Sequence, residues 1–135
     1  MSNVQTVQEI YAAFGRGEVS AILSTLATDV VWECETPAAL SFGGIRRGVA
    51  EAVGLFEGIA KEHADPKLEM TDFFSAGEAV AVFGRYEATV RASGKRVSTP
   101  VAHYFKFREG KVVRYIGLLN TGAFVAAMQA DSAAA

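Results

Sequence analysis

His103 is the first side chain in this sequence to consider for acid–base chemistry. It lies in the run VAHYFKF, where Val101, His103, Phe105 and Phe107 alternate along an expected strand and share one face. Because the other three are apolar, we expect this face to point inward and His103 to be the only inward group that titrates near neutrality. Apolar surroundings should lower the pKa of its imidazole and keep it neutral, as a hydrogen-bond acceptor or weak base. The alternative is a hydrogen-bonded core histidine without a ligand.

Cys34 is the second candidate for chemistry. In the strand DVVWEC, Trp32 and Cys34 alternate with Val31 and Glu33 and so share a face. Cys34 could pair with His103 as a nucleophile, but this needs a short hydrogen bond and an electropositive site. We therefore interpret Cys34 as a small buried hydrophobe. As the only cysteine it excludes an internal disulfide, which favours a reducing, cytoplasmic setting.

Aromatic residues from several expected elements should surround these two side chains. The predicted pocket-lining residues are Tyr11, Phe14, Trp32, Cys34, Phe56, Tyr86, Phe105, Tyr115 and Asn120. For each aromatic residue the alternative is packing in the core. Asn120 is either a polar pocket group or a turn residue before the last helix.

Helical periodicity dominates the first half of the chain. Apolar residues recur at helical spacing over residues 4–14, with Ser2 and Gln5 as a capping box, and then over 19–26 and 49–63. Between the second and third helices we expect a strand at 29–34. The segment 35–48, rich in glycine, predicts a loop that forms the rim or lid of a pocket.

The second half alternates with period two and is punctuated by glycine-containing turns, which predicts hairpins. The expected strands are 67–75, 79–92, 96–107 and 112–120, followed by a closing helix at 122–129. The fold class is therefore α+β, a single domain over residues 1–135. A curved antiparallel sheet, a cone-shaped half-barrel, is closed by three N-terminal helices and followed by a short C-terminal helix.

Composition excludes several functions. Thirteen Lys and Arg against 15 Asp and Glu, spread along the chain, leave no basic patch for nucleic acid. No cysteine–histidine spacing suggests a metal, no motif implies an organic cofactor, and no apolar stretch reaches the roughly 18 residues of a membrane span. On the outer sheet face we expect Tyr104 and other aromatic side chains to be covered in a homodimer.

The order of these segments resembles a known family. IYAAFGRGEV, LATDVVWE, RRGVAEAVGLFEGI, SGKRVSTPVAHYFKF and EGKVVRY follow one another as in the nuclear transport factor 2-like superfamily, and more closely as in its polyketide-cyclase-like (SnoaL-like) and ketosteroid-isomerase-like branch. The resemblance implies the cone-shaped fold with an interior pocket. It does not fix the activity, because one fold hosts many functions.

The catalytic patterns that the resemblance implies are only partly present. At the positions of the isomerase tyrosine, its base and its second acid stand Ile10, Cys34 and His103, and none of them matches. The polyketide-cyclase-like branch implies a histidine in the penultimate strand, matched by His103, and an acidic base in the last strand. Asn120 stands where we expect that acid, and an amide cannot abstract a proton.

Three readings of function remain open. The first is a cofactor-free isomerase, cyclase or hydrolase that acts on a small apolar or aromatic compound with His103 as acid or base. The second is a non-catalytic protein that binds such a compound. The third is a dimeric interaction module without a ligand.

Overall fold

The structure is a computed structural model that describes residues 1–35 and 41–129. The helices are α1 (Asn3–Arg16), α2 (Val19–Leu23), α3 (Gly48–Glu62) and α4 (Thr121–Met128), and the strands are β1 (Leu26–Cys34), β2 (Gly44–Arg47), β3 (His63–Ala76), β4 (Ala79–Val90), β5 (Arg96–Arg108) and β6 (Lys111–Leu119). This is the α+β architecture expected from the sequence.

All six strands form one sheet in the order β2-β1-β6-β5-β4-β3. The expected meander is confirmed, since β3, β4, β5 and β6 pair antiparallel in chain order. The first strand, β1, pairs in parallel with the last, β6, and antiparallel with β2. Shifts of register between Ala64 and Lys67 and between Met70 and Asp72 interrupt the long β3, and irregularities of this kind bend a strand.

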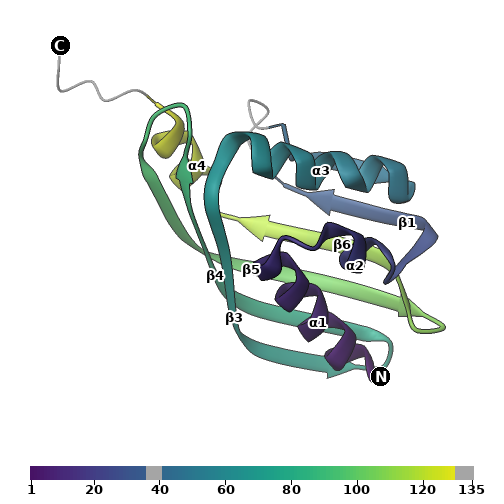
Figure 1. Cartoon of the computed structure of the whole chain (residues 1–135). Coiled ribbons are helices and arrows are strands. Elements are labelled where there is room, and N and C mark those ends of the chain that lie inside the picture. Colours follow the sequence, from purple (N-terminus) through teal and green to yellow (C-terminus); the bar gives the residue numbers. More distant parts are fainter. Residues whose placement is uncertain (36–40, 130–135) are drawn as a thin grey trace, which may run out of the picture.

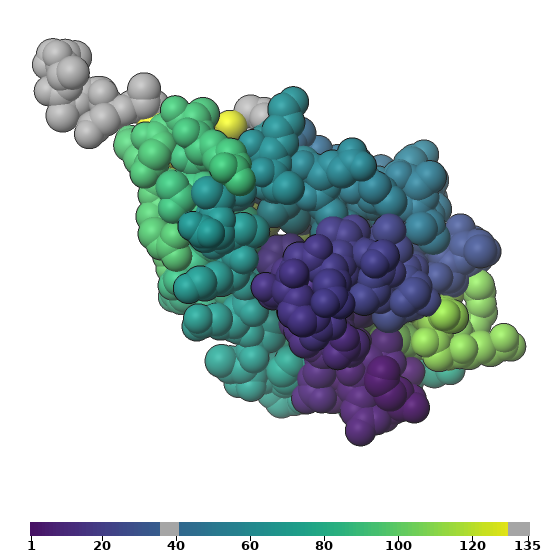
Figure 2. All heavy atoms as spheres, in the orientation of Figure 1, coloured from purple at the N-terminus to yellow at the C-terminus, as the bar shows by residue number. Residues whose placement is uncertain are grey.

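Three helices cover one face of the curved sheet and leave the other face open (Figure 1). In the space-filling view of this side, α1, α2 and α3 lie next to one another over the strands (Figure 2). The core lies between the two layers and contains the buried side chains of all four helices together with the inward residues of β1, β4, β5 and β6. In the part of the chain described, no helix is long and apolar enough to cross a membrane.

The first helix has the predicted N-terminal cap and runs two residues beyond its predicted end. The Ser2 hydroxyl accepts from the Gln5 backbone N–H at 3.1 Å, and the Gln5 side chain accepts from the Ser2 N–H at 2.9 Å, which completes the capping box. Gly17 ends the helix in the left-handed region, with φ 72°.

Three boundaries differ from the sequence prediction. Leu26, expected in the second helix, begins β1, because α2 stops after five residues. His63, expected at the end of the third helix, is the first residue of β3. Within the expected loop 35–48, residues 44–47 form the edge strand β2, while residues 36–40 lie outside the described residues.

Candidate functional site

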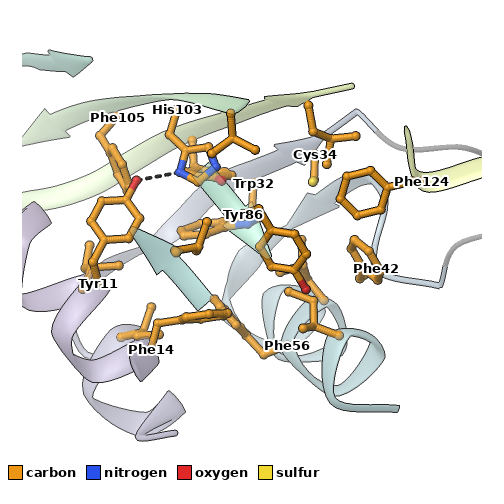
Figure 3. A pocket seen from close by; sticks show the side chains of 18 residues that line it. Tyr11, Phe14, Trp32, Cys34, Phe42, Phe56, Tyr86, His103, Phe105 and Phe124 are labelled. Atoms are coloured by element: carbon orange, nitrogen blue, oxygen red, sulfur yellow. Dashed lines mark hydrogen bonds between the residues drawn. The ribbon is translucent and has the colours of Figure 1, made fainter. Parts of the chain in front are cut away.

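An aromatic cavity lies between the sheet and the helices. Its walls come from residues of all four helices and from inward residues of the sheet (Figure 3). The space open to the centres of water-sized molecules is about 70 Å³. This is several times the roughly 10–15 Å³ that one water needs on the same measure, so the cavity has room for a small organic molecule.

Most of the residues predicted to line a pocket contribute to this wall. The structure places eight of the nine there, together with His103: Tyr11, Phe14, Trp32, Cys34, Phe56, Tyr86, Phe105 and Tyr115. Asn120 is not part of the wall among the described residues. Its side-chain oxygen accepts from the Ala123 backbone N–H at 3.2 Å and caps the start of α4.

Tyr11 and His103 form the main polar contact inside the cavity. The Tyr11 hydroxyl from α1 lies 2.6 Å from Nδ1 of His103 on β5 (Figure 3). Burial lowers the pKa of His103 to about 3, in the direction expected from the sequence. Burial also raises the pKa of the Tyr11 hydroxyl well above its usual value. Both groups are therefore neutral at physiological pH.

The hydrogen bond can run in either direction, and each direction gives the cavity a different group. If the Tyr11 hydroxyl donates to Nδ1, the imidazole proton sits on Nε2, and His103 offers a donor. If Nδ1–H donates to the Tyr11 oxygen, Nε2 is a bare acceptor. No hydrogen bond to Nε2 of His103 is found among the described residues, so this nitrogen is available to a ligand.

Trp32 and Tyr115 form a stacked pair on neighbouring strands. Their ring centroids are 3.9 Å apart and their planes 14° apart, and His103 meets Tyr115 edge-on at 5.2 Å. The indole N–H of Trp32 is buried and has no hydrogen-bond partner within the described part of the chain. A buried donor of this kind is costly to leave unpaired.

Cys34 lies at the cavity wall as a neutral thiol. Burial raises its pKa to about 12, and the nearby Arg46 only partly opposes this effect. A thiol that stays protonated at neutral pH is a poor nucleophile. The geometry therefore agrees with Cys34 as a small apolar wall residue.

A second histidine–tyrosine pair was missed from the sequence. His63 is fully buried, and its Nδ1 lies 2.6 Å from the hydroxyl of Tyr86, which lines the cavity. Burial lowers the pKa of His63 as well. The expectation that His103 is the only inward imidazole is thus wrong, because His63 opens a strand with its side chain facing in instead of ending a helix.

The end of the expected rim loop contributes Phe42 to the cavity. Phe42 is 3 % exposed and packs edge-on against His63, with ring centroids 5.1 Å apart. The neighbouring Ser41 N–H donates to a Glu62 carboxylate oxygen at 2.8 Å. A Cβ at Gly58 on α3 would lie 3.1 Å from the Phe42 backbone nitrogen, so this glycine allows the segment to pack closely on the helix.

The electrostatic character of the wall is neutral. None of the residues that line the cavity in the described ranges is Asp, Glu, Lys or Arg. Among the same residues, no group of His, Cys, Asp and Glu side chains could hold a metal ion. The polar side-chain groups of the wall residues are hydroxyl, imidazole, indole and thiol groups, none of which is a strong base.

Other wall residues were also absent from the sequence prediction. They are the apolar side chains Ile10, Ile22, Leu55, Ile59, Leu68, Val101, Leu119 and Phe124. Their helical or alternate spacing showed an inward face, but that signal does not separate the cavity wall from the solid core.

Comparison with known proteins agrees with the fold. The sequence model of the SnoaL-like domain matches residues 7–115. An NTF2-like protein of unknown function from Burkholderia pseudomallei is 28 % identical, with a TM-score of 0.88 over 96 % of this chain and 100 % of that chain. No curated protein matches the sequence.

Two further solved structures share the fold at lower identity. TerC, co-crystallised with polyporic acid, is 24 % identical, with a TM-score of 0.85 over 93 % of this chain and 97 % of that chain. A putative polyketide cyclase from Xanthomonas campestris is 20 % identical, with a TM-score of 0.81 over 94 % of this chain and 96 % of that chain.

Proposed function

This chain belongs to the SnoaL-like domain family, and from that premise we propose that it is a small-molecule pocket protein that takes up a small, uncharged apolar or aromatic compound. The observation that carries the proposal is the cavity with its aromatic wall and its few convergent polar groups. The co-crystallisation of TerC, a protein of the same fold, with polyporic acid supports a small organic ligand.

The ligand should be uncharged because the wall offers no opposite charge. A carboxylate or ammonium group would lose its hydration in this cavity without an ion pair to replace it. Apolar surface gains about 25 cal/mol per Å² on leaving water, so a flat hydrocarbon skeleton supplies most of the affinity. The Tyr11–His103 pair then orients the polar end of the ligand.

Binding without chemistry is the function that we favour. With its pKa lowered to about 3, His103 is a weak base, and burial opposes the formation of a tyrosinate at Tyr11. These neutral groups hold hydrogen bonds well and exchange protons poorly. The described part of the wall also lacks a carboxylate base.

Titration calorimetry with α-methylstyrene, an uncharged aromatic hydrocarbon, tests the proposal. We expect saturable binding at one site per chain and a higher unfolding temperature, because a ligand at 100 times its dissociation constant adds about 2.7 kcal/mol. Ile59→Trp replaces a partly buried wall residue of α3 by a larger side chain and should weaken binding, because the indole would occupy part of the cavity. Tyr104→Phe on the outer sheet face should leave binding unchanged. If α-methylstyrene does not bind detectably, or does not bind at a single site, the cavity does not have the proposed binding function.

A cofactor-free enzyme is the second candidate, and the short Tyr11–His103 contact inside the cavity favours it. In this reading Nε2 of His103 is the acid–base group of an isomerase, cyclase or hydrolase. With acetophenone in D2O, His103 would take a methyl proton, the electron pair would move to the carbonyl oxygen, and a deuteron would return to carbon. Proton NMR of the methyl signal follows this exchange. Exchange that is lost in His103→Gln supports the enzyme, and exchange at the rate of buffer alone excludes this chemistry for acetophenone.

We further propose that the chain acts as one domain and as a homodimer, and that it works in the cytoplasm, where a single cysteine stays reduced. Phe74, Phe83 and Leu118 on the outer sheet face are 59 %, 47 % and 49 % exposed. Phe83 and Leu118 both pair with Ala102, and Tyr104 lies two residues further along the same strand, on the same face. A second copy would cover this apolar face. Sedimentation should give a dimer that Phe83→Glu dissociates; a monomeric wild type would contradict the proposal.

A further inference from the structure

Tyr115 is a buried residue whose hydroxyl takes part in no contact described so far. Its ring is fixed by the stack on Trp32 and by the edges of His103 and Phe105, with ring centroids 3.9, 5.2 and 5.1 Å away. The side chain is 7 % exposed. No hydrogen bond of the Tyr115 hydroxyl occurs among the residues described, although it belongs to the cavity wall.

Gly117 decides where this hydroxyl lies. A Cβ at Gly117 would come within 2.6 Å of the Tyr115 hydroxyl oxygen and 3.0 Å of its Cε2. Residues 115 and 117 point to the same face of β6, so the Tyr115 side chain leans along the strand and fills the space that Gly117 leaves free. Any larger residue at position 117 would displace the hydroxyl.

The strand register brings this hydroxyl next to His103. Gly117 pairs directly with His103 on β5 and with Cys34 on β1. Directly paired residues on one face of an antiparallel pair have Cβ atoms about 5 Å apart, so the Tyr115 hydroxyl lies beside the base of the His103 side chain. One row across the sheet thus holds an imidazole, a phenol and a thiol.

Tyr115 and His103 can both act as hydrogen-bond donors. Burial raises the pKa of Tyr115 well above its usual value, and nearby Cys34 and Tyr11 add to the effect, so its O–H stays protonated. When the Tyr11 hydroxyl donates to Nδ1 of His103, the imidazole proton sits on Nε2. Tyr115 and His103 both line the cavity, so a phenol O–H and an imidazole N–H are then available on the same wall.

We propose that Tyr115, positioned by Gly117, donates a hydrogen bond to the ligand and, together with His103, selects molecules that carry a carbonyl oxygen. A carbonyl oxygen has two lone pairs and no proton, so it can accept from both donors at once. The same skeleton without an oxygen leaves both donors unpaired in an apolar cavity, which costs affinity. This inference rests on the proposed binding function and adds the chemical class of the ligand.

Acetophenone and α-methylstyrene test the inference, since they have nearly the same shape and differ in C=O against C=CH2. Calorimetry of wild type, Tyr115→Phe, Gly117→Ala and the outer-face control Tyr104→Phe gives the ratio of their dissociation constants. We expect Tyr115→Phe to weaken acetophenone by about 10-fold relative to α-methylstyrene, which corresponds to the loss of one hydrogen bond. Tyr104→Phe should leave the ratio unchanged.

Gly117→Ala should lower the preference for acetophenone as Tyr115→Phe does, and the double variant should lose no more than either single variant, because both remove the same contact. The carbonyl carbon resonance of bound 13C-labelled acetophenone reports polarisation directly. The resonance of acetophenone bound to wild type should lie downfield of the resonance of acetophenone bound to Tyr115→Phe. A purely structural role of Tyr115 would not produce this difference.

The outcomes separate this inference from the function on which it rests. If neither compound binds to wild type, the binding function fails and the inference fails with it. If both bind but the ratio and the carbonyl resonance stay the same in Tyr115→Phe, only the role of Tyr115 is refuted. If Gly117→Ala leaves the ratio unchanged while Tyr115→Phe lowers it, the positioning role of Gly117 is refuted.

Discussion

Removal of the Tyr11 hydroxyl should destabilise the protein because it leaves the buried imidazole of His103 without its hydrogen-bond partner. In Tyr11→Phe the ring keeps its contacts, but Nδ1 of His103 loses its only hydrogen bond among the described residues, which is 2.6 Å long. A buried polar group without a partner costs about 1–3 kcal/mol. For a chain of this size, each kcal/mol of lost stability lowers Tm by roughly 3–5 °C.

A double-mutant cycle separates the hydrogen bond from other effects of the substitution. In Tyr11→Phe combined with His103→Leu both polar groups are replaced by apolar ones, and such double replacements are close to neutral. We therefore expect the double variant to be more stable than the sum of the single changes by about 1–2 kcal/mol. Tyr104→Phe on the outer sheet face is the matched control and should change stability by less than about 0.5 kcal/mol.

Urea unfolding followed by far-UV circular dichroism gives the four free energies of unfolding, with the m-values as a check that the unfolding transition is unchanged. A coupling energy near zero, with Tyr11→Phe as stable as wild type, would refute the hydrogen bond between these side chains. The role of His103 as an oriented, neutral group would then fail too.

Three further predictions follow from the same structure. The pKa of His103 is about 3 in the folded state against about 6.5 in the unfolded state, so the unfolded state takes up the proton first as the pH falls. The free energy of unfolding should therefore fall by about 1.4 kcal/mol per pH unit below pH 6. Urea titrations at pH 4–7 should show a smaller slope for His103→Gln. Gly84→Ala should destabilise the protein by at least about 2 kcal/mol, because the new Cβ would lie 2.6 Å from the Met70 Cα. Gly15→Ala should stabilise it by up to about 1 kcal/mol, because this position has open space and a helical backbone. Equal Tm values for the two variants would contradict this prediction. Ser2→Ala should cost about 1 kcal/mol by opening the capping box, and an unchanged midpoint of urea unfolding would count against that cap.

Local signals in the sequence predicted the frame of the fold. The Ser2 cap acts within one helical turn, and the alternation around His103 reports which face of a strand is apolar; neither depends on distant parts of the chain. The parallel pairing of β1 with β6 was not predicted, because it joins segments about 80 residues apart and no local pattern encodes it. The edge strand β2 was missed because only four residues of a glycine-rich segment pair with β1.

The site was predicted where alternation is regular and missed where it breaks. Trp32, Tyr86 and Phe105 each lie in a stretch where burial alternates from residue to residue, and counting by two placed them inward. His63 stands at a junction between helix and strand, ahead of a shift of register in β3, so neither period applied to it. Asn120 follows the last strand residue, where capping of α4 fixes its direction.

The central claim, that the interior cavity takes up a small uncharged aromatic molecule, is tested most directly by a crystal structure with 4-bromoacetophenone, whose bromine can be located by anomalous scattering. We predict one bromine peak inside the wall formed by Trp32, Phe105 and Tyr115, with the carbonyl oxygen within hydrogen-bond distance of the Tyr115 hydroxyl. A cavity without a peak, or bromine only on the outer sheet face, would contradict the account.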